Sequence, residues 1–171
     1  MNIVATASVI EALNAWREAE RRWEPTDPAD ADYRANAIAV VSAWLRYQEL
    51  AGDEPGSFVL VTDDEHRYVA VGEGVESALG YRSADLLGRR IEDIAAPDLV
   101  PGTAAAWQLF LSDGRQDGQF RLIASDGREV VMTFQARAHH PIPGFHSSRL
   151  RPIEVRPTTG QSLAAEASVN G

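Results

Sequence analysis

The stretch FVLVTDDEHRYVAVGEGVESALGYRSADLLGRRIEDIA, residues 58–95, decides how this chain is expected to fold. Two short apolar runs, residues 58–62 and 67–71, are separated by the acidic break Asp63-Asp64-Glu65, which predicts a β-hairpin. After Gly72 the spacing of apolar residues changes from two towards 3.6, which predicts a relay of short helices punctuated by glycines. The stretch therefore predicts two strands followed by several short helices.

Four further elements are predicted downstream of this stretch. Residues 98–113 are expected to form a long connecting helix. Residues 118–125 and 128–138 alternate apolar and polar side chains, and Asp126-Gly127 between them is typical of a tight hairpin turn. Residues 145–153 are expected to form a last strand.

The segment LGYRSADLLGR, residues 79–89, resembles the recurrent LGYSxEELxGR segment of the PAS domain family. The order of elements over residues 56–154 is similar to that family as well. The resemblance implies an α+β PAS fold, in which a five-stranded antiparallel sheet wraps short helices and leaves an apolar cleft on its inner face. It also implies a sensory role, exerted through changes in protein contacts. One departure is Gly72, because PAS domains often carry asparagine where the second strand meets the next helix.

Composition points to three segments within the 171 residues. We expect an N-terminal helical hairpin in residues 1–55, with helices at 3–23 and 28–51, for dimerisation or as a cap. A PAS domain is expected in residues 56–156. Residues 157–171, rich in Pro, Thr, Gly, Ser and Ala, are expected to form a disordered tail.

The second predicted helix carries an unusually wide apolar arc. Five of its residues recur at spacings of four and three: Tyr33, Ala37, Val40, Trp44 and Tyr47. Ile38, Val41 and Leu45 widen this stripe beyond a simple coiled-coil seam. The helix can cover its own sheet together with the first helix, or it can pair with a second copy, and the two arrangements are compatible. We expect a homodimer whose interface contains the five residues of the stripe.

Charge and composition exclude several classes of function. The net charge of −9 and the absence of a basic patch argue against a nucleic-acid or anionic-membrane surface. The absence of cysteine excludes disulfides, cysteine-ligated metals and cysteinyl photochemistry. The N-terminus lacks the basic and apolar regions of a signal peptide, so we expect a cytoplasmic protein.

Alternation along the predicted strands indicates which side chains enter the cleft. In residues 128–138 the even positions are apolar and the odd positions are mostly polar, so the even face is expected to be the inner one. The candidate ligand-binding residues are Leu79, Leu87, Ile91, Ile94, Val100, Trp107, Leu111, Phe120, Leu122, Met132, Phe134 and His140. These side chains can instead pack together and leave no cavity, and that alternative stays open. Trp107 and Phe134 are expected to face each other.

No cofactor or metal is expected from the residues present. The resemblance places the haem-ligand position of PAS sensors near Thr103, and no histidine lies between residues 98 and 113. Gln119 and Gln135, the amides that flavin binding would need, are expected to point outward. His139, His140 and His146 are close in sequence, but adjacent residues on a strand point to opposite faces, so no metal site is expected. His140 follows the inner-face parity and is a candidate polar anchor at the cleft mouth.

The resulting hypothesis is a stand-alone cytoplasmic PAS sensor or interaction module that acts through its own dimer or through an unidentified signalling protein. A binding sensor or carrier for a small molecule or a haem- or flavin-like cofactor is the second hypothesis. The third is a small enzyme on a cone-shaped α+β scaffold of the ketosteroid-isomerase type. An enzyme would need an acid or base inside the cleft, whereas the predicted lining is apolar, so we expect no catalytic activity.

Overall fold

A computed structural model describes residues 3–52 and 54–157 of the chain. The part of the expected disordered tail that follows Pro157 lies outside the described residues. None of the helices within the described ranges is long and apolar enough to cross a lipid bilayer.

The expected five-stranded antiparallel sheet is confirmed, with the strand order β2-β1-β5-β4-β3. Its strands are β1 (Phe58–Asp63), β2 (Tyr68–Val71), β3 (Arg115–Ile123), β4 (Glu129–Arg137) and β5 (Phe145–Arg156). The first strand therefore pairs with the last one in the centre of the sheet, while β2 and β3 form the two edges. Asp126-Gly127 closes the hairpin between β3 and β4, where Gly127 takes a φ of 87° that favours glycine.

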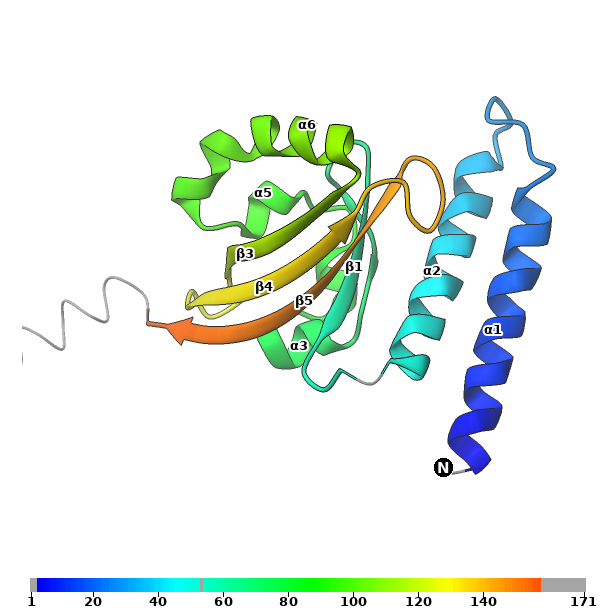
Figure 1. Ribbon diagram of the computed structural model, residues 1–171, viewed down its shortest axis with the longest axis horizontal. Helices are drawn as coiled ribbons and strands as arrows, with labels where there is room; N and C mark the ends of the chain where they lie inside the picture. The colour runs from blue at the N-terminus through cyan, green and yellow to red at the C-terminus, as the bar shows by residue number, and fades with distance from the viewer. Residues whose placement is uncertain (1–2, 53, 158–171) are drawn as a thin grey trace, which may run out of the picture.

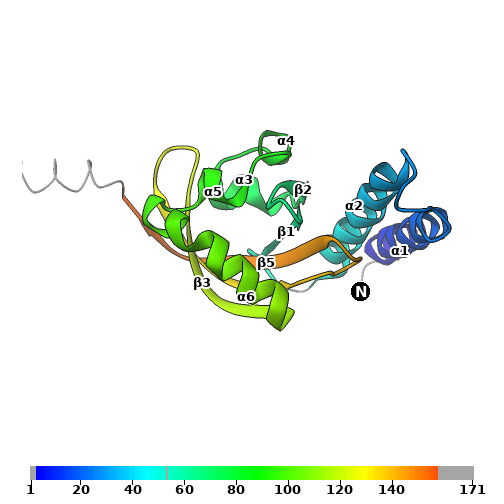
Figure 2. The ribbon, with the colours of Figure 1, turned by 90° about the horizontal axis from the view of Figure 1, so that it is seen from above.

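The chain crosses from one edge of the sheet to the other through five short helices. These are α3 (Gly74–Leu79), α4 (Ser83–Leu86), α5 (Ile91–Ile94), the 3₁₀ helix η1 (Pro97–Gly102) and α6 (Thr103–Asp113). They lie away from the N-terminal pair α1 (Ile3–Trp23) and α2 (Tyr33–Ala51), which stand beside the sheet (Figures 1 and 2). The sheet is therefore covered on both sides near β1 and β2.

Two helices begin later than expected. The second helix begins at Tyr33 rather than Pro28, because the preceding residues form hydrogen-bonded turns; the Asp27 carboxylate accepts the Ala29 N–H at 2.9 Å. The connecting helix begins as the 3₁₀ helix η1, which contains Pro101, and becomes α-helical only at Thr103. Proline lacks the N–H that an α-helix interior needs, so its position delays the helix.

The central strand β1 is buried along its whole length. Phe58 and Leu60 belong to the main core with α3, α4 and α5, whereas Val59 and Val61 pack against α2 on the opposite side of the sheet. A strand that is apolar on both faces must be covered on both faces. The helix α2 is therefore part of the same packed body as the sheet.

The five residues expected at a dimer seam are instead covered within one chain: Tyr33, Ala37, Val40, Trp44 and Tyr47. The middle three are 0%, 0% and 5% exposed, because they pack in the cluster that holds α2 on β1 and β2. The two tyrosines contact α1, with ring-centroid distances of 6.1 Å to Trp23 and 5.5 Å to Trp16. The expected interface is thus corrected: the chain's own sheet and first helix cover this stripe.

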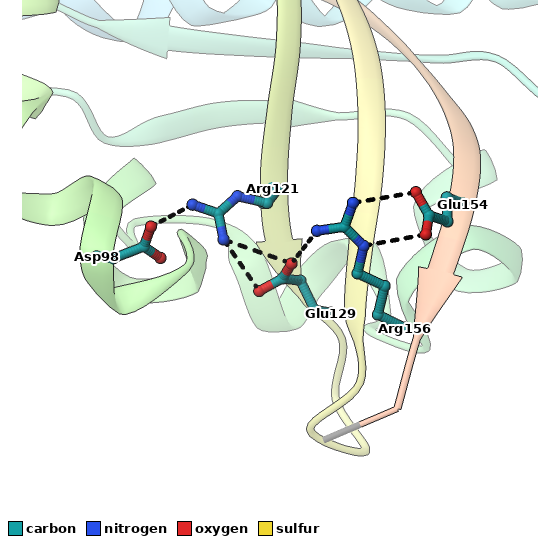
Figure 3. A network of polar contacts seen from close by, with 5 residues as sticks. All are labelled: Asp98, Arg121, Glu129, Glu154 and Arg156. Atoms are coloured by element: carbon teal, nitrogen blue, oxygen red, sulfur yellow. Dashed lines mark hydrogen bonds and ion pairs between the residues drawn. The ribbon is translucent and has the colours of Figure 1, made fainter. Parts of the chain in front are cut away.

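A chain of ion pairs links the strands β3, β4 and β5 at the end of the sheet away from α2 (Figure 3). Arg121 binds Asp98 of η1 and reaches Glu129 at 3.4 Å. Arg156 contacts the same Glu129 at 3.3 Å and Glu154 at 3.0 Å. Because most of these groups are exposed to solvent, which screens their charges, we expect each pair to contribute little to the stability of the fold.

Gly72 allows α2 to reach the start of α3. The carboxylate of Glu49 on α2 accepts the backbone N–H of Glu73 at 2.8 Å. A Cβ on Gly72 would lie 2.4 Å from Glu49 Oε1 and 2.9 Å from the Val59 carbonyl oxygen. The glycine that replaces the asparagine common in PAS domains therefore leaves room for a carboxylate from the N-terminal helix pair.

We expect Gly72→Ala to lower the free energy of unfolding by roughly 1–3 kcal/mol, because the backbone of Val59 cannot move freely. Chemical denaturation of the variant and the wild type measures the difference. Gly118→Ala is the matched control, since a Cβ there would lie 3.5 Å from the Phe134 ring, an ordinary contact. Equal losses in the two variants would contradict the close approach at Gly72.

Candidate functional site

A cavity of about 300 Å³ lies between the inner face of the sheet and the helices α5, η1 and α6. All five strands contribute to its wall, and most of the lining side chains are apolar. The strand order explains where the cavity lies. The crossover helices connect the two edge strands β2 and β3, so they run across the inner face of the sheet, and the cavity lies between the two layers. The inner face of the sheet is therefore not fully closed, and the use of this cavity as a ligand pocket stays a prediction.

Five of the twelve predicted cleft residues line this cavity: Ile91, Trp107, Phe120, Leu122 and Phe134. Leu79, Ile94 and Met132 are buried in the core beside it, and Leu111 packs against the small cluster of Trp107 and Phe110. The even positions of β4 face inward as predicted, and Trp107 and Phe134 line the same cavity.

Three of the twelve predictions are corrected by the structure. Leu87 and Val100 are 50% and 37% exposed, because Leu86 takes the buried position of α4 and Val100 lies on the outer side of η1. His140 contacts Trp44 edge-on at 5.2 Å, in the groove beside α2. The alternation ends with β4 at Arg137, and His139 takes a positive φ of 52°, so the inner-face parity does not continue to His140.

The polar side chains of the cavity wall were not predicted. Thr62, Tyr68, His146 and Ser148 all line the cavity. Thr62 on β1 stands opposite Tyr68 on β2 and opposite His146 on β5, so these three residues form one row across the sheet. This row depends on the pairing of the first strand with the last one, which the amino-acid sequence does not reveal on its own.

His146 is 2% exposed and both of its ring nitrogens are engaged. Its Nδ1 accepts the backbone N–H of His139 at 3.0 Å, and its Nε2 lies 2.7 Å from Asp64 Oδ1. Because a backbone N–H can only donate, the ring proton belongs on Nε2, which donates to the carboxylate. Burial lowers the pKa of His146, against the opposite effect of Asp64, so the ring is neutral.

Trp107 of α6 is held between two imidazole rings at the edge of the cavity. Its ring centroid lies 4.1 Å from that of His66 and 5.1 Å from that of His146. His66 Nδ1 lies 2.6 Å from Glu92 Oε1, so each imidazole is oriented by its own carboxylate. This arrangement fixes α6 over the cavity.

A metal ion would have to break this hydrogen-bonded arrangement. Side-chain ligand atoms of Asp64, His139 and His146 lie within 4.8 Å of one another. However, His139 Nδ1 accepts the Gly144 N–H at 2.9 Å, just as His146 Nδ1 accepts a backbone N–H. The Nε2 atoms then carry protons, whereas coordination requires a free lone pair. The donor set therefore favours a hydrogen-bond network over a metal site.

Comparisons with known proteins agree with this geometry. Residues 68–142 match the model of the PAS fold family. The PAS domain of a protein from Colwellia psychrerythraea has a TM-score of 0.55 and 17% identity, covering 64% of this chain and 97% of its own. The PAS domain of the RpfR quorum-sensing receptor of Cronobacter turicensis, in complex with BDSF, has a TM-score of 0.51 and 13% identity, covering 60% and 99%. No curated protein matches the chain.

We expect the thermal stability of the protein to fall as the pH drops below the ordinary imidazole pKa of 6.5. Burial lowers the pKa of both His146 and His140, so the unfolded chain binds more protons than the folded one below that pH. Above pH 6.5 both histidines are neutral in the folded and the unfolded chain, so protonation costs no stability. As the pH falls from 6.5 towards the lowered pKa values of the folded protein, protonation of the unfolded chain lowers the free energy of unfolding. In His146→Gln, the loss of melting temperature between pH 7.5 and 5.5 should be smaller than in the wild type. Identical losses would contradict the assignment of a neutral His146.

Proposed function

Since the sheet and its crossover helices form a PAS domain, a sensory module, we propose that this chain binds a small apolar molecule and converts its presence into a change of protein contacts. PAS domains are generally non-enzymatic. Among the residues that the structure describes, His146 is the one histidine that lines the cavity, and both of its ring nitrogens are engaged. A role in binding therefore agrees with the site better than a role in acid–base catalysis.

The cavity is the observation that carries this proposal. Its volume of about 300 Å³ is at the lower end of the range typical of small-molecule sites. Its wall is apolar with a few polar groups, which is the usual composition of such sites. The RpfR PAS domain, which has a similar fold, is in complex with BDSF, so this fold can hold a small molecule.

The strand β1 offers a short path from the cavity to the N-terminal helices. Leu60 and Thr62 line the cavity, whereas their neighbours Val59 and Val61 pack against α2. A ligand that displaces β1 therefore displaces the surface on which α2 rests. Packed interfaces tend to switch between discrete arrangements rather than deform continuously.

The helix pair is the proposed output of the module. α1 packs on α2 and lies farther from the sheet than α2 does (Figure 1). Its exposed side includes Ile10, which is 52% exposed. A shift of α2 would therefore move a surface that a signalling protein or a second copy of the chain can contact. A carrier would bind the same ligand without this shift.

Filling the cavity should abolish binding without unfolding the protein. Ala136, on the inner face of β4, lines the cavity and is 7% exposed. We expect Ala136→Phe to weaken binding of 2-ethylnaphthalene, a small neutral probe, by at least about tenfold in isothermal titration calorimetry, because the new ring occupies the site. Circular dichroism checks that the variant is folded.

Ala105→Phe is the control for this experiment, because Ala105 is exposed on α6 and does not line the cavity. Its affinity for the probe should equal that of the wild type. If the wild type binds neither 2-ethylnaphthalene nor its ketone analogue 2-acetylnaphthalene, or if Ala136→Phe binds them as tightly as the wild type does, the cavity is not a ligand site.

A further inference from the structure

We propose that the cavity selects an uncharged apolar ligand that carries one carbonyl or hydroxyl group, held by the side-chain hydroxyls of Thr62, Tyr68 and Ser148. The proposal rests on the ligand-binding function proposed above and specifies the chemistry of the ligand.

The three hydroxyl-bearing residues occupy neighbouring positions on the inner face of three adjacent strands. Thr62 on β1 is paired with Tyr68 on β2. Leu60, two residues before Thr62 and on the same face, is paired with Ser148 on β5. Inner-face neighbours in an antiparallel sheet lie roughly 4.5–8 Å apart, so one polar group can approach more than one of them. These three side chains, here called the polar patch, therefore start from adjacent positions of a mostly apolar wall.

These hydroxyls have no hydrogen-bond partner among the residues of the described ranges. Thr62 and Tyr68 are only 6% and 4% exposed overall, yet their hydroxyl oxygens are not among the completely buried unpaired atoms of the described residues, and both residues line the cavity. Of the other polar side chains of the wall, His146 has both nitrogens engaged and the Thr103 hydroxyl donates to the Leu99 carbonyl at 3.2 Å. Gln116 lies on the edge strand β3, separated by β4 from the strands that carry the three hydroxyls. The hydroxyls are therefore reached from the cavity, where a ligand with a polar group gains a hydrogen-bond partner and a pure hydrocarbon gains none.

The charges around the cavity decide which ligand group fits. None of the lining residues is an arginine, and the chain contains no lysine. The carboxylates of Asp64 and Glu92 are hydrogen-bonded to the two imidazoles that flank Trp107, which makes the surroundings less favourable for an anion. A carboxylate ligand would lose its hydration without gaining a cation, whereas a ketone, ester, amide or alcohol loses far less.

The phenol of Tyr68 is suited to donate to such a ligand. Burial, with smaller contributions from the Glu92 and Asp93 carboxylates, raises the pKa of Tyr68 far above its usual range. The hydroxyl therefore keeps its proton at any physiological pH. Thr62 and Ser148 hydroxyls can both donate and accept, so the patch accommodates a carbonyl oxygen or a hydroxyl equally.

A matched set of three probes tests the proposal by isothermal titration calorimetry at pH 7.5. 2-Acetylnaphthalene carries a carbonyl, 2-naphthoate has the same shape with a negative charge, and 2-ethylnaphthalene has no polar group. We expect the ketone to bind tightest and the naphthoate to bind at least about tenfold more weakly than the ketone. Thr62→Val, Tyr68→Phe and Ser148→Ala should each weaken the ketone by roughly twofold to tenfold and leave 2-ethylnaphthalene unchanged.

Ser147→Ala is the control, because Ser147 neighbours Ser148 on β5 but is paired with Val61, whose side chain packs against α2 on the opposite face of the sheet. It should bind all three probes like the wild type. Melting temperatures confirm that each variant is folded, and if one variant fails to fold, the other two decide. Equal affinities of the wild type for the ketone and the naphthoate overturn the proposed selection. So do variants that weaken binding of the ketone and of the hydrocarbon to the same extent. In both cases the ligand-binding function itself stands. Failure of all three probes to bind the wild type overturns the binding function and this proposal with it.

Discussion

The burial of β1 on both faces is the constraint on which the rest of the structure depends. Phe58 and Leu60 lie in the main core, whereas Val59 and Val61 pack under α2. The crossover helices cover only one face of this strand, so its other apolar face needs a second cover. This explains why an N-terminal helix with a wide apolar arc belongs to the same packed body as the sheet. It also explains why that arc is not left for a second copy of the chain.

The same strand separates the cavity from the helix pair. On its inner side, the cavity is bounded by Trp107, which two imidazoles hold in place, each with its own carboxylate. On its outer side, the Glu49 carboxylate of α2 reaches past Gly72 and accepts the backbone N–H of Glu73, just before α3. Contacts on both sides thus converge on β1 and β2. In the proposed function, a ligand that displaces β1 therefore also displaces α2, which packs on the same strand.

The fold was predicted from the resemblance of residues 79–89, and of the order of elements over residues 56–154, to the PAS family. The inner face of β4 followed from alternation, which is a local property of the sequence. The apolar half of the cavity wall followed from the same alternation, as Phe120, Leu122 and Phe134 show. What could not be predicted depends on contacts between distant segments. The row of Thr62, Tyr68 and His146 arises only when β1 lies between β2 and β5.

His140 shows a second limit of sequence-based reasoning. Its parity follows the strand only as long as the strand continues, and the positive φ of His139 ends that continuity. The dimer stripe shows a third limit. Periodicity identified the apolar arc of α2. Whether Ala37, Val40 and Trp44 contact the chain's own sheet or a partner depends on how much of the surface of β1 must be covered.

Native-state hydrogen exchange measures most directly how far α2 and β1 depend on each other. Amides of α2 near Val40 and amides of β1 near Leu60 should exchange with the same free energy of opening, because neither element is stable without the other. Rapid exchange in α2 beside full protection in β1 would show that the helix is a dispensable appendage and would contradict this account.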